Sequence, residues 1–278
     1  MTRSWPVWAL LGGLSLPVFG QGLYLHVIPT DLPDGPPGDR GEPWSVEMEV
    51  NDVSSAAELM PSALTWEALP AAGDETASGR LRIAVEENLV LGGEPTPADR
   101  KASFSIDFHE PSVVALAERL LEASTPDELV SRPSIETLVR LTDESIGVKN
   151  SSRRRDIASR VARDGVGDCT EHAVLLVALA RAFGYPARVI QGLVVSVLTD
   201  GTVEEGPRAG AFGHAWAEIH DGERWRTADA TRLDREEGVD LRYLPLWAPK
   251  NEGPGRGMEA LRYSVLMPKS VSLRRKVP

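Results

Sequence analysis

Three segments in the first part of the chain alternate between hydrophobic and polar side chains. They run from Trp44 to Val50, from Leu81 to Val85 and from Phe104 to Phe108. A period of two is typical of strands that bury one face. Residues 44–108 are therefore predicted to form a β-rich N-terminal region, in which no residues indicate chemistry.

From Pro111 onward the spacing of hydrophobic residues changes to that of helices. Hydrophobic side chains recur at helical spacing in residues 113–121, after Pro133 and in residues 153–163. Because proline is favoured in the first turn of a helix, Pro133 is expected near a helix start. The change from strand-like to helix-like spacing predicts an α+β fold.

The most hydrophobic helix is predicted between Asp168 and Gly184. Its centre, residues 173–180, is hydrophobic on all sides, which is typical of a helix buried on every face. Asp168 is a favourable N-cap, and Glu171 follows three positions later, as in a capping box. Gly184 is suited to end the helix. The sole cysteine, Cys169, would occupy the first helical position.

A hairpin is predicted around Asp221 and Gly222, which lie between two strand-like segments. If these two residues form the turn, or if a four-residue turn has the same centre, His214 lies directly opposite Asp229. Opposed residues have Cβ atoms about 4.5–5.5 Å apart. The imidazole and the carboxylate could then share a hydrogen bond.

The N-terminal segment is expected to direct or anchor the chain. Arg3 precedes a hydrophobic stretch from Trp5 to Phe19, and no Lys, Arg, Asp or Glu occurs between Arg3 and Asp31. This pattern predicts a signal peptide or a membrane anchor over residues 1–28, with a buried helix as a third alternative. Either leading interpretation places the rest of the chain in the cell envelope, on the periplasmic or extracellular side, secreted or anchored.

The remaining boundaries follow from composition. Residues 29–43 are rich in Pro, Gly and Asp, and are predicted to be a linker. Residues 109–250, which contain Cys169, His214 and Asp229, are expected to form one domain. Residues 251–278 are predicted to be a C-terminal tail, and the charges of Arg274 to Lys276 are typical of a solvated end.

The net charge of the chain limits the kinds of partner that are expected. The formal net charge of −11 argues against nucleic acid or an anionic membrane surface, because both attract Lys and Arg. The single cysteine excludes an internal disulfide, so Cys169 is either a buried structural residue or a reactive thiol.

The position of Cys169 favours a reactive thiol. Backbone N–H groups at a helix N-terminus stabilise a thiolate and can bind the oxyanion of an acyl-transfer transition state. With His214 as the base and Asp229 as the acid that orients it, Cys169 would complete a catalytic triad. Alternatively, these three residues and His172 bind a metal, an interpretation weakened by the lack of a second cysteine.

Three motifs occur in a fixed order between Pro111 and Thr231. They are Gly167-Asp-Cys-Thr-Glu-His-Ala173, Gly184-Tyr-Pro-Ala-Arg-Val-Ile-Gln-Gly192, and Gly213-His-Ala-Trp-Ala-Glu218 followed by Asp229-Ala-Thr231. Together they resemble the transglutaminase-like superfamily, especially its bacterial members. The resemblance implies a papain-like α+β core, in which a helix bundle carrying the nucleophile packs on an antiparallel sheet. It also implies Cys169 as the nucleophile, His214 as the base and Asp229 as the third member.

Two features depart from the family pattern. The family often has Asp-Pro-Thr where this chain has Asp-Ala-Thr from Asp229, and the aromatic residue frequent before the nucleophile helix is replaced by Ile146-Gly-Val. The wall of the substrate channel and any side-chain donor to the oxyanion are therefore not identified from the sequence.

The implied reaction is acyl transfer on peptide or protein amides through a thioester, without a cofactor. An amine acceptor would make the protein a transglutaminase, and water would make it a cysteine peptidase or amidase. A loop over residues 199–213, just before His214, is expected to help exclude water. A non-catalytic envelope scaffold or peptide-binding module is the alternative from another class.

Overall fold

The computed structural model describes residues 27–31, 44–69, 79–86, 89–122, 132–149, 157–198, 208–231, 239–249 and 261–275. These residues combine helices with two antiparallel-rich sheets, which confirms the predicted α+β class. Two short 3-10 helices, η3 (Pro97–Arg100) and η5 (Ser264–Leu266), lie in connecting segments.

The described helices, apart from one short helix, gather in a single layer. They are α2 (Pro111–Glu122), α4 (Ile135–Ser145), α5 (Ala158–Asp164) and α6 (Cys169–Ala182). Residues 173–180 of α6 are all buried, because the other helices and a sheet pack around them. A short parallel strand pair, β6 (Val148–Lys149) and β7 (Val166–Gly167), leads directly into α6.

The ends of α6 are as predicted. Asp168 is the N-cap, and its side chain and that of Glu171 form a reciprocal capping box. Gly184 follows the helix with a φ of 78°, a left-handed conformation that glycine adopts without strain. α4 begins after Ser134, whose hydroxyl accepts the N–H of Thr137, so Pro133 lies just outside the helix.

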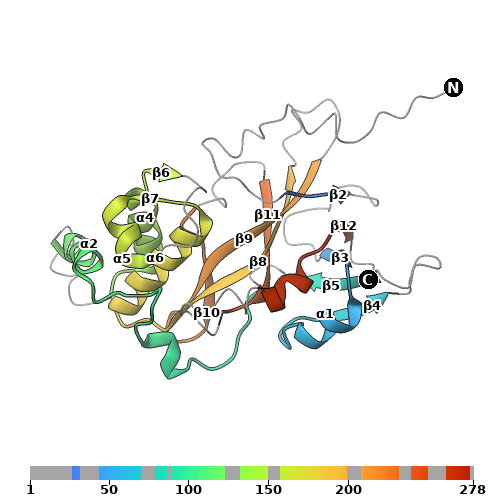
Figure 1. Ribbon diagram of the computed structural model, residues 1–278, viewed down its shortest axis with the longest axis horizontal. Coiled ribbons are helices and arrows are strands. Elements are labelled where there is room, and N and C mark those ends of the chain that lie inside the picture. The colour runs from blue at the N-terminus through green and yellow to red at the C-terminus, as the bar shows by residue number, and fades with distance from the viewer. Residues whose placement is uncertain are drawn as a thin grey trace.

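The central sheet is built on a long antiparallel pair. Its strands are β1 (Val27–Ile28), β8 (Ala187–Leu198), β9 (Arg208–His220), β10 (Trp225–Ala228) and β11 (Val239–Trp247), in the order β1-β9-β8-β11 with β10 also on β9. One face of the long pair packs against α6 through Val189 and Ala217, and farther along against the second sheet through Leu193 and Ala211. Figure 1 shows the helices and the second sheet on either side of β8 and β9.

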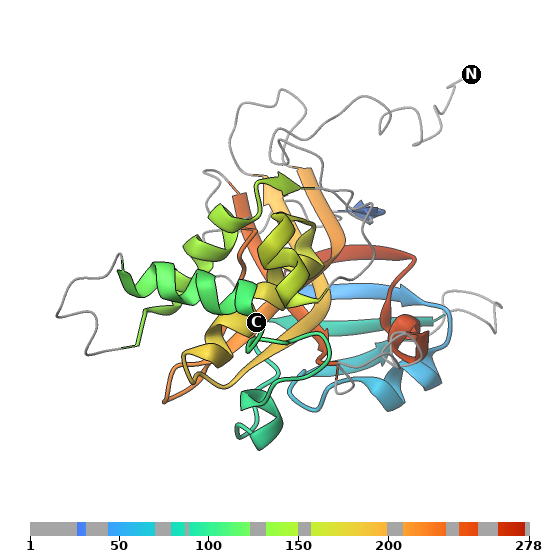
Figure 2. The ribbon, with the colours of Figure 1, turned by 60° about the vertical axis from the view of Figure 1, so that its left-hand side comes forward.

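The second sheet follows the order β2-β12-β3-β5-β4. Its strands are β2 (Thr30–Asp31), β3 (Trp44–Val50), β4 (Trp66–Leu69), β5 (Gly79–Val85) and β12 (Ser270–Arg275), and α1 (Val53–Leu59) is packed beside it. β3 and β5 confirm two of the three predicted strands. Figure 2 shows β3, β5 and β12 running across the direction of the long strands.

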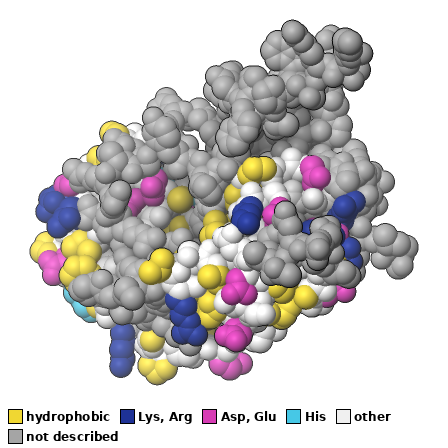
Figure 3. Space-filling model, turned by 45° about the vertical axis from the view of Figure 1, so that its right-hand side comes forward, with side chains coloured by type: hydrophobic (Ala, Val, Ile, Leu, Met, Phe, Trp, Pro, Cys, Tyr) yellow, Lys and Arg dark blue, Asp and Glu magenta, His cyan; other side chains and the backbone are white. Residues whose placement is uncertain are grey.

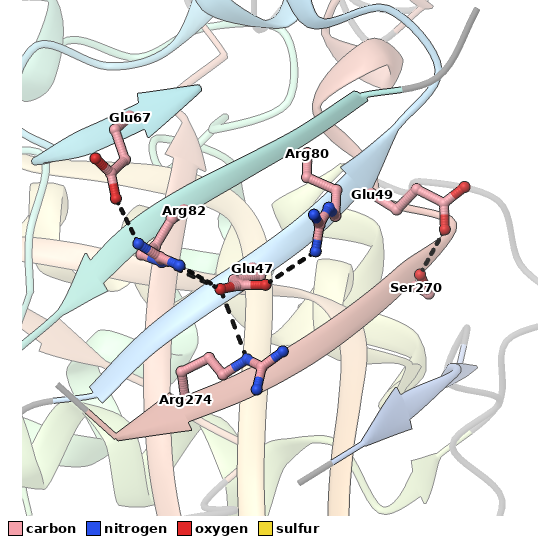
Figure 4. Close-up of polar contacts among 7 residues, drawn as sticks. All are labelled: Glu47, Glu49, Glu67, Arg80, Arg82, Ser270 and Arg274. Atoms are coloured by element: carbon pink, nitrogen blue, oxygen red, sulfur yellow. Dashed lines mark hydrogen bonds and ion pairs between the residues drawn. The ribbon is translucent and has the colours of Figure 1, made fainter. Parts of the chain in front are cut away.

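The predicted C-terminal tail is wrong for residues 270–275. They form β12, which lies between β2 and β3 and buries Val271 and Leu273 in the core. Arg274 points to the other face, where it approaches the buried carboxylate of Glu47 (Figure 4). Its charge therefore marks the polar face of a strand and not a solvated end.

The strand predicted from Phe104 to Phe108 is also absent from the described structure. Ile106 and Phe108 are buried as their alternation indicates, but they pack into the helical layer without a partner strand. The backbone is satisfied locally instead: Ile106 N–H donates to the Ser103 hydroxyl, and Ala158 N–H donates to Ser105 O.

Most of the predicted targeting segment, residues 1–26, and residues 32–43 of the predicted linker lie outside the described residues. Val27 and Ile28 form β1, which pairs with β9, and Thr30 and Asp31 form β2. Within the part of the chain described here, no helix is both long enough and hydrophobic enough to cross a membrane.

Charged side chains of both signs occur on the face of the molecule shown in Figure 3. On the face in Figure 3, Lys and Arg alternate with Asp and Glu, and no extended basic patch appears among the side chains drawn in colour.

Candidate active site

His214 and Asp229 lie on the hairpin as expected, but in a different register. β10 pairs with β9 so that Thr227 lies opposite Glu218. Extended by two residues, this register brings Asp229 level with Trp216 rather than with His214. The predicted direct opposition of His214 and Asp229 is therefore wrong.

The turn causes this shift. Asp221 to Arg224 separate the two strands, so the centre of the turn lies one residue later than predicted. The Asp221 carboxylate accepts the N–H groups of Glu223 and Arg224 at 2.8 and 2.9 Å, and Gly222 has a φ of 116°. Because the pairing moves by an even number of positions, Asp229 stays on the same face as His214.

The imidazole and the carboxylate meet diagonally across the strands. His214 Nε2 donates to Asp229 Oδ2 at 2.8 Å, and both side chains are buried. The other oxygen, Oδ1, accepts the backbone N–H and the hydroxyl of Thr231 at 2.9 and 2.7 Å. The Tyr243 hydroxyl donates to Oδ2 at 2.8 Å. Four hydrogen bonds therefore fix the Asp229 carboxylate. Because an ionised carboxylate can only accept hydrogen bonds, His214 Nε2 must carry a proton.

His214 lies on a segment of β9 that is not paired with another described strand along one edge. β1 pairs with Ala211 and Phe212 of β9, and β10 pairs with β9 from Ala217 onward. No strand in the described residues covers 213–216 on this edge. The half-exposed Cys169, at the N-terminus of α6, comes close enough to His214 to interact with its ring.

The charges of the three side chains are coupled. Burial alone lowers the pKa of the His214 imidazole, but the charges of Asp229 and Cys169 outweigh burial and raise this pKa well above its ordinary value. In return, the His214 imidazolium lowers the pKa of Asp229 despite the burial of the carboxylate. The second ring nitrogen of His214, Nδ1, makes no hydrogen bond of ordinary geometry to a described residue. It is the nitrogen left to face the thiol.

The first turn of α6 leaves one N–H group available. The Asp168 carboxylate accepts the N–H of Thr170 at 2.8 Å and, through the capping box, that of Glu171. The N–H of Cys169 donates to no described residue. Of the first three N–H groups, only that of Cys169 could therefore bind an oxyanion.

His172 does not join these residues as a metal ligand. Its Nδ1 lies 2.6 Å from Asp168 O in its own helix, and burial lowers the pKa of the ring. Across the described ranges, no group of three or more His, Cys, Asp or Glu side chains is arranged to hold a metal ion.

Aromatic side chains surround the His214 ring. Trp216 stacks on it with ring centroids 6.1 Å apart, and Phe212 meets it edge to face at 5.8 Å. Gly192 lies directly opposite His214 on β8, where a Cβ atom would come within 2.6 Å of the Trp216 indole. The glycine thus lets the indole lie across β8.

A buried ion pair fixes the end of the hairpin. Arg188 donates to Glu218 through Nε at 2.9 Å and a terminal nitrogen at 2.5 Å, and Glu218 also accepts the N–H of Leu91 at 2.8 Å. Arg188 lies 4.0 Å from the centre of the Trp225 ring. This cluster was not predicted, although Arg188 and Glu218 both lie within the three sequence motifs.

The predicted loop before His214 is shorter than expected. Residues 208–213 form the first part of β9. The remaining residues, 199–207, lie outside the described structure.

Comparison with known proteins agrees with the motifs. Residues 115–230 match the model of the Transglutaminase-like superfamily. No curated protein sequence matches the chain. A candidate cysteine protease from Cytophaga hutchinsonii aligns with 84% of this chain and 86% of its own at 14% identity, with a TM-score of 0.39. The periplasmic domain of TgpA from Pseudomonas aeruginosa, bound to ethylmercury, aligns with 76% of this chain and 84% of its own at 15% identity, with a TM-score of 0.35.

Proposed function

We propose that the chain, whose residues 115–230 match the model of the Transglutaminase-like superfamily, is a cysteine-dependent enzyme of acyl transfer on peptide or protein amides. Cys169 is the nucleophile, His214 the general base and acid, and Asp229 the residue that orients His214. The observation that carries this proposal is the hydrogen bond from His214 to a fully bonded Asp229 carboxylate, beside a thiol at a helix N-terminus.

The first half-reaction forms a thioester. The Cys169 thiolate attacks the carbonyl carbon of the amide, the C–N bond breaks, and the His214 imidazolium gives its proton to the departing amine. Asp229 stabilises the imidazolium and keeps the proton of the free imidazole on Nε2, so that Nδ1 faces the thiol. The Cys169 N–H is the backbone donor available to the oxyanion.

The second half-reaction breaks the thioester. His214 takes a proton from an incoming amine or water, which attacks the thioester carbon and releases the Cys169 thiolate. Amine attack gives a new amide, as in a transglutaminase, and water gives the hydrolysed acid, as in a peptidase or amidase. We name acyl transfer to an amine as the first candidate because of the family match.

The test is mass spectrometry of a peptide library incubated with the protein and a primary amine. Amine-containing peptides support the proposed transfer, and cleaved or deamidated peptides without amine support the hydrolytic alternative. Cys169→Ala should abolish either product. Products that persist in this variant would contradict the proposal.

A matched pair of histidine variants separates catalysis from folding. His214→Asn should lose activity, whereas His220→Asn should retain it, because His220 lies on the same strand but packs against Trp225 away from the thiol. An unreactive peptide library, together with a Cys169 thiol that iodoacetamide labels no faster than it labels the unfolded chain, would favour the scaffold alternative.

We also propose that this reaction takes place outside the cytoplasm. The support is the hydrophobic segment after Arg3, which has the form of a signal peptide or an anchor. Fusing residues 1–43 to alkaline phosphatase, which is active only where disulfides form, tests this location. An inactive fusion would contradict it.

A further inference from the structure

Tyr243 is bonded to the same carboxylate oxygen as His214. Its hydroxyl donates to Asp229 Oδ2 at 2.8 Å, and His214 Nε2 donates to that oxygen at the same distance. Tyr243 comes from β11, which is separated from β9 by β8. No sequence motif drew attention to it.

Packing on one face of the central sheet lets the Tyr243 side chain extend across β8 to Asp229. Its ring meets Trp216 at 5.1 Å with an interplanar angle of 67°, and lies 6.4 Å from the His214 ring. β8 lies between Tyr243 and His214, and Gly192, opposite His214, carries no side chain that would obstruct this face. The ring is thus held by packing, while its hydroxyl is directed at the carboxylate.

We propose that Tyr243 is a positioning residue that fixes the Asp229 carboxylate toward His214 and limits how strongly this carboxylate holds the imidazolium. This inference rests on the proposed function, because it concerns the same thiol and imidazole. It adds a residue outside the triad, and this residue shifts the pH range in which His214 carries a second proton.

The physical reason is competition for one oxygen. A donor to a carboxylate oxygen reduces the negative charge that the oxygen offers to its other partner. With the Tyr243 hydroxyl present, Asp229 stabilises the His214 imidazolium less than it would alone. Removing the hydroxyl should make the imidazolium harder to deprotonate.

Other titratable groups also influence the charges of His214 and Asp229, and the variants leave these groups unchanged. Cys169 and His172 from α6 act directly, and Asp143 from α4 and Lys149 from β6 act through His172. Two of these groups have contacts elsewhere: Lys149 Nζ donates to Asp143 Oδ1 at 3.3 Å, and His172 Nδ1 lies 2.6 Å from Asp168 O.

The test is the pH dependence of Cys169 alkylation by iodoacetamide. Cys169 is the only cysteine, so labelling reports on it alone and requires no substrate. The rate should change once as the thiolate forms and again, at alkaline pH, as the imidazolium loses its proton. In Tyr243→Phe the alkaline transition should move up by roughly half to one pH unit.

Tyr185→Phe is the matched control. The Tyr185 hydroxyl donates to Pro133 O at 2.9 Å, away from the triad, so this variant loses a similar hydrogen bond but should keep the wild-type pH profile. If Tyr243→Phe folds poorly, 3-fluorotyrosine at position 243 preserves the ring. Its more acidic hydroxyl should donate more strongly and move the alkaline transition down.

The outcomes separate the two claims. A wild-type profile with no imidazole-dependent transition would overturn the proposed thiol–imidazole pair, and the role of Tyr243 with it. The role of Tyr243 alone would be overturned if the wild type shows two transitions and neither Tyr243→Phe nor the fluorotyrosine variant moves them. An equal shift in Tyr185→Phe would also overturn it.

Discussion

Replacing Asp229 with Asn should reverse the tautomer of His214 without changing the shape of the site. The new amide must keep its carbonyl oxygen toward Thr231, because the Thr231 N–H donates there and cannot face an NH2 group. The amide NH2 then faces His214 Nε2, which can only accept from it. The imidazole proton moves to Nδ1, the nitrogen that should receive the proton of the Cys169 thiol.

The acylation rate of Asp229→Asn should fall strongly, because the variant loses both the base that faces the thiol and the carboxylate that stabilises the imidazolium. An Asp-to-Asn change of this kind in a catalytic triad costs about 10³–10⁴-fold in rate. This corresponds to roughly 4–5.5 kcal/mol of transition-state stabilisation. The substitution keeps the volume of the side chain, so the loss should appear in the rate of acylation and not in the fold.

The assay is the rate at which p-nitrophenyl acetate acylates the protein, followed by release of p-nitrophenolate. Asp107→Asn is the control, because Asp107 also accepts a backbone N–H, that of Ser159 at 2.8 Å, but does so at the start of α5. The control should acylate at the wild-type rate. An Asp229→Asn variant that acylates within tenfold of the wild-type rate would refute the tautomer argument.

Three further predictions concern stability. Gly192→Ala should destabilise the fold by roughly 1–3 kcal/mol in urea denaturation, because the new methyl group collides with the Trp216 indole and the Leu244 carbonyl. The raised pKa of His214 predicts stabilisation that is complete below about pH 6.5 and declines as the pH rises toward the folded-state pKa, and His214→Gln should remove this alkaline decline in the free energy of unfolding. Glu47→Gln should lower the free energy of unfolding by about 1–3 kcal/mol, and by less at high salt, because it removes the charge of a buried carboxylate that pairs with half-exposed arginines (Figure 4).

Local signals predicted the nucleophile helix well. Asp168, Glu171 and Gly184 act through contacts within a few residues of each other, so the bounds of α6 followed from the sequence. The burial of residues 173–180 followed in the same way from their hydrophobicity on every side.

The hairpin shows how a local error can leave a functional prediction intact. Asp221 and Gly222 correctly indicated a turn, but the bonds from the Asp221 side chain to two following N–H groups extend it to four residues. Dipeptide preference does not reveal these bonds. Because the register moved by an even number, His214 and Asp229 still share a face and still meet.

Long-range contacts were not predictable from patterns. Tyr243 reaches Asp229 only because β11 pairs with β8, and β12 joins the second sheet from the opposite end of the chain. In both cases, strand pairing over long sequence separations decides the structure, and neither hydrophobic period nor motif spacing specifies which strands become neighbours.

The most direct test of the proposed mechanism is the identity of the acyl adduct formed with p-nitrophenyl acetate. We predict a burst of about one p-nitrophenolate per chain, as expected for an acyl-enzyme that accumulates. Mass spectrometry of the quenched protein should place one acetyl group on Cys169, and neutral hydroxylamine should remove it, as it removes thioesters. Absence of the burst, or an adduct that persists in Cys169→Ala, would contradict Cys169 as the nucleophile.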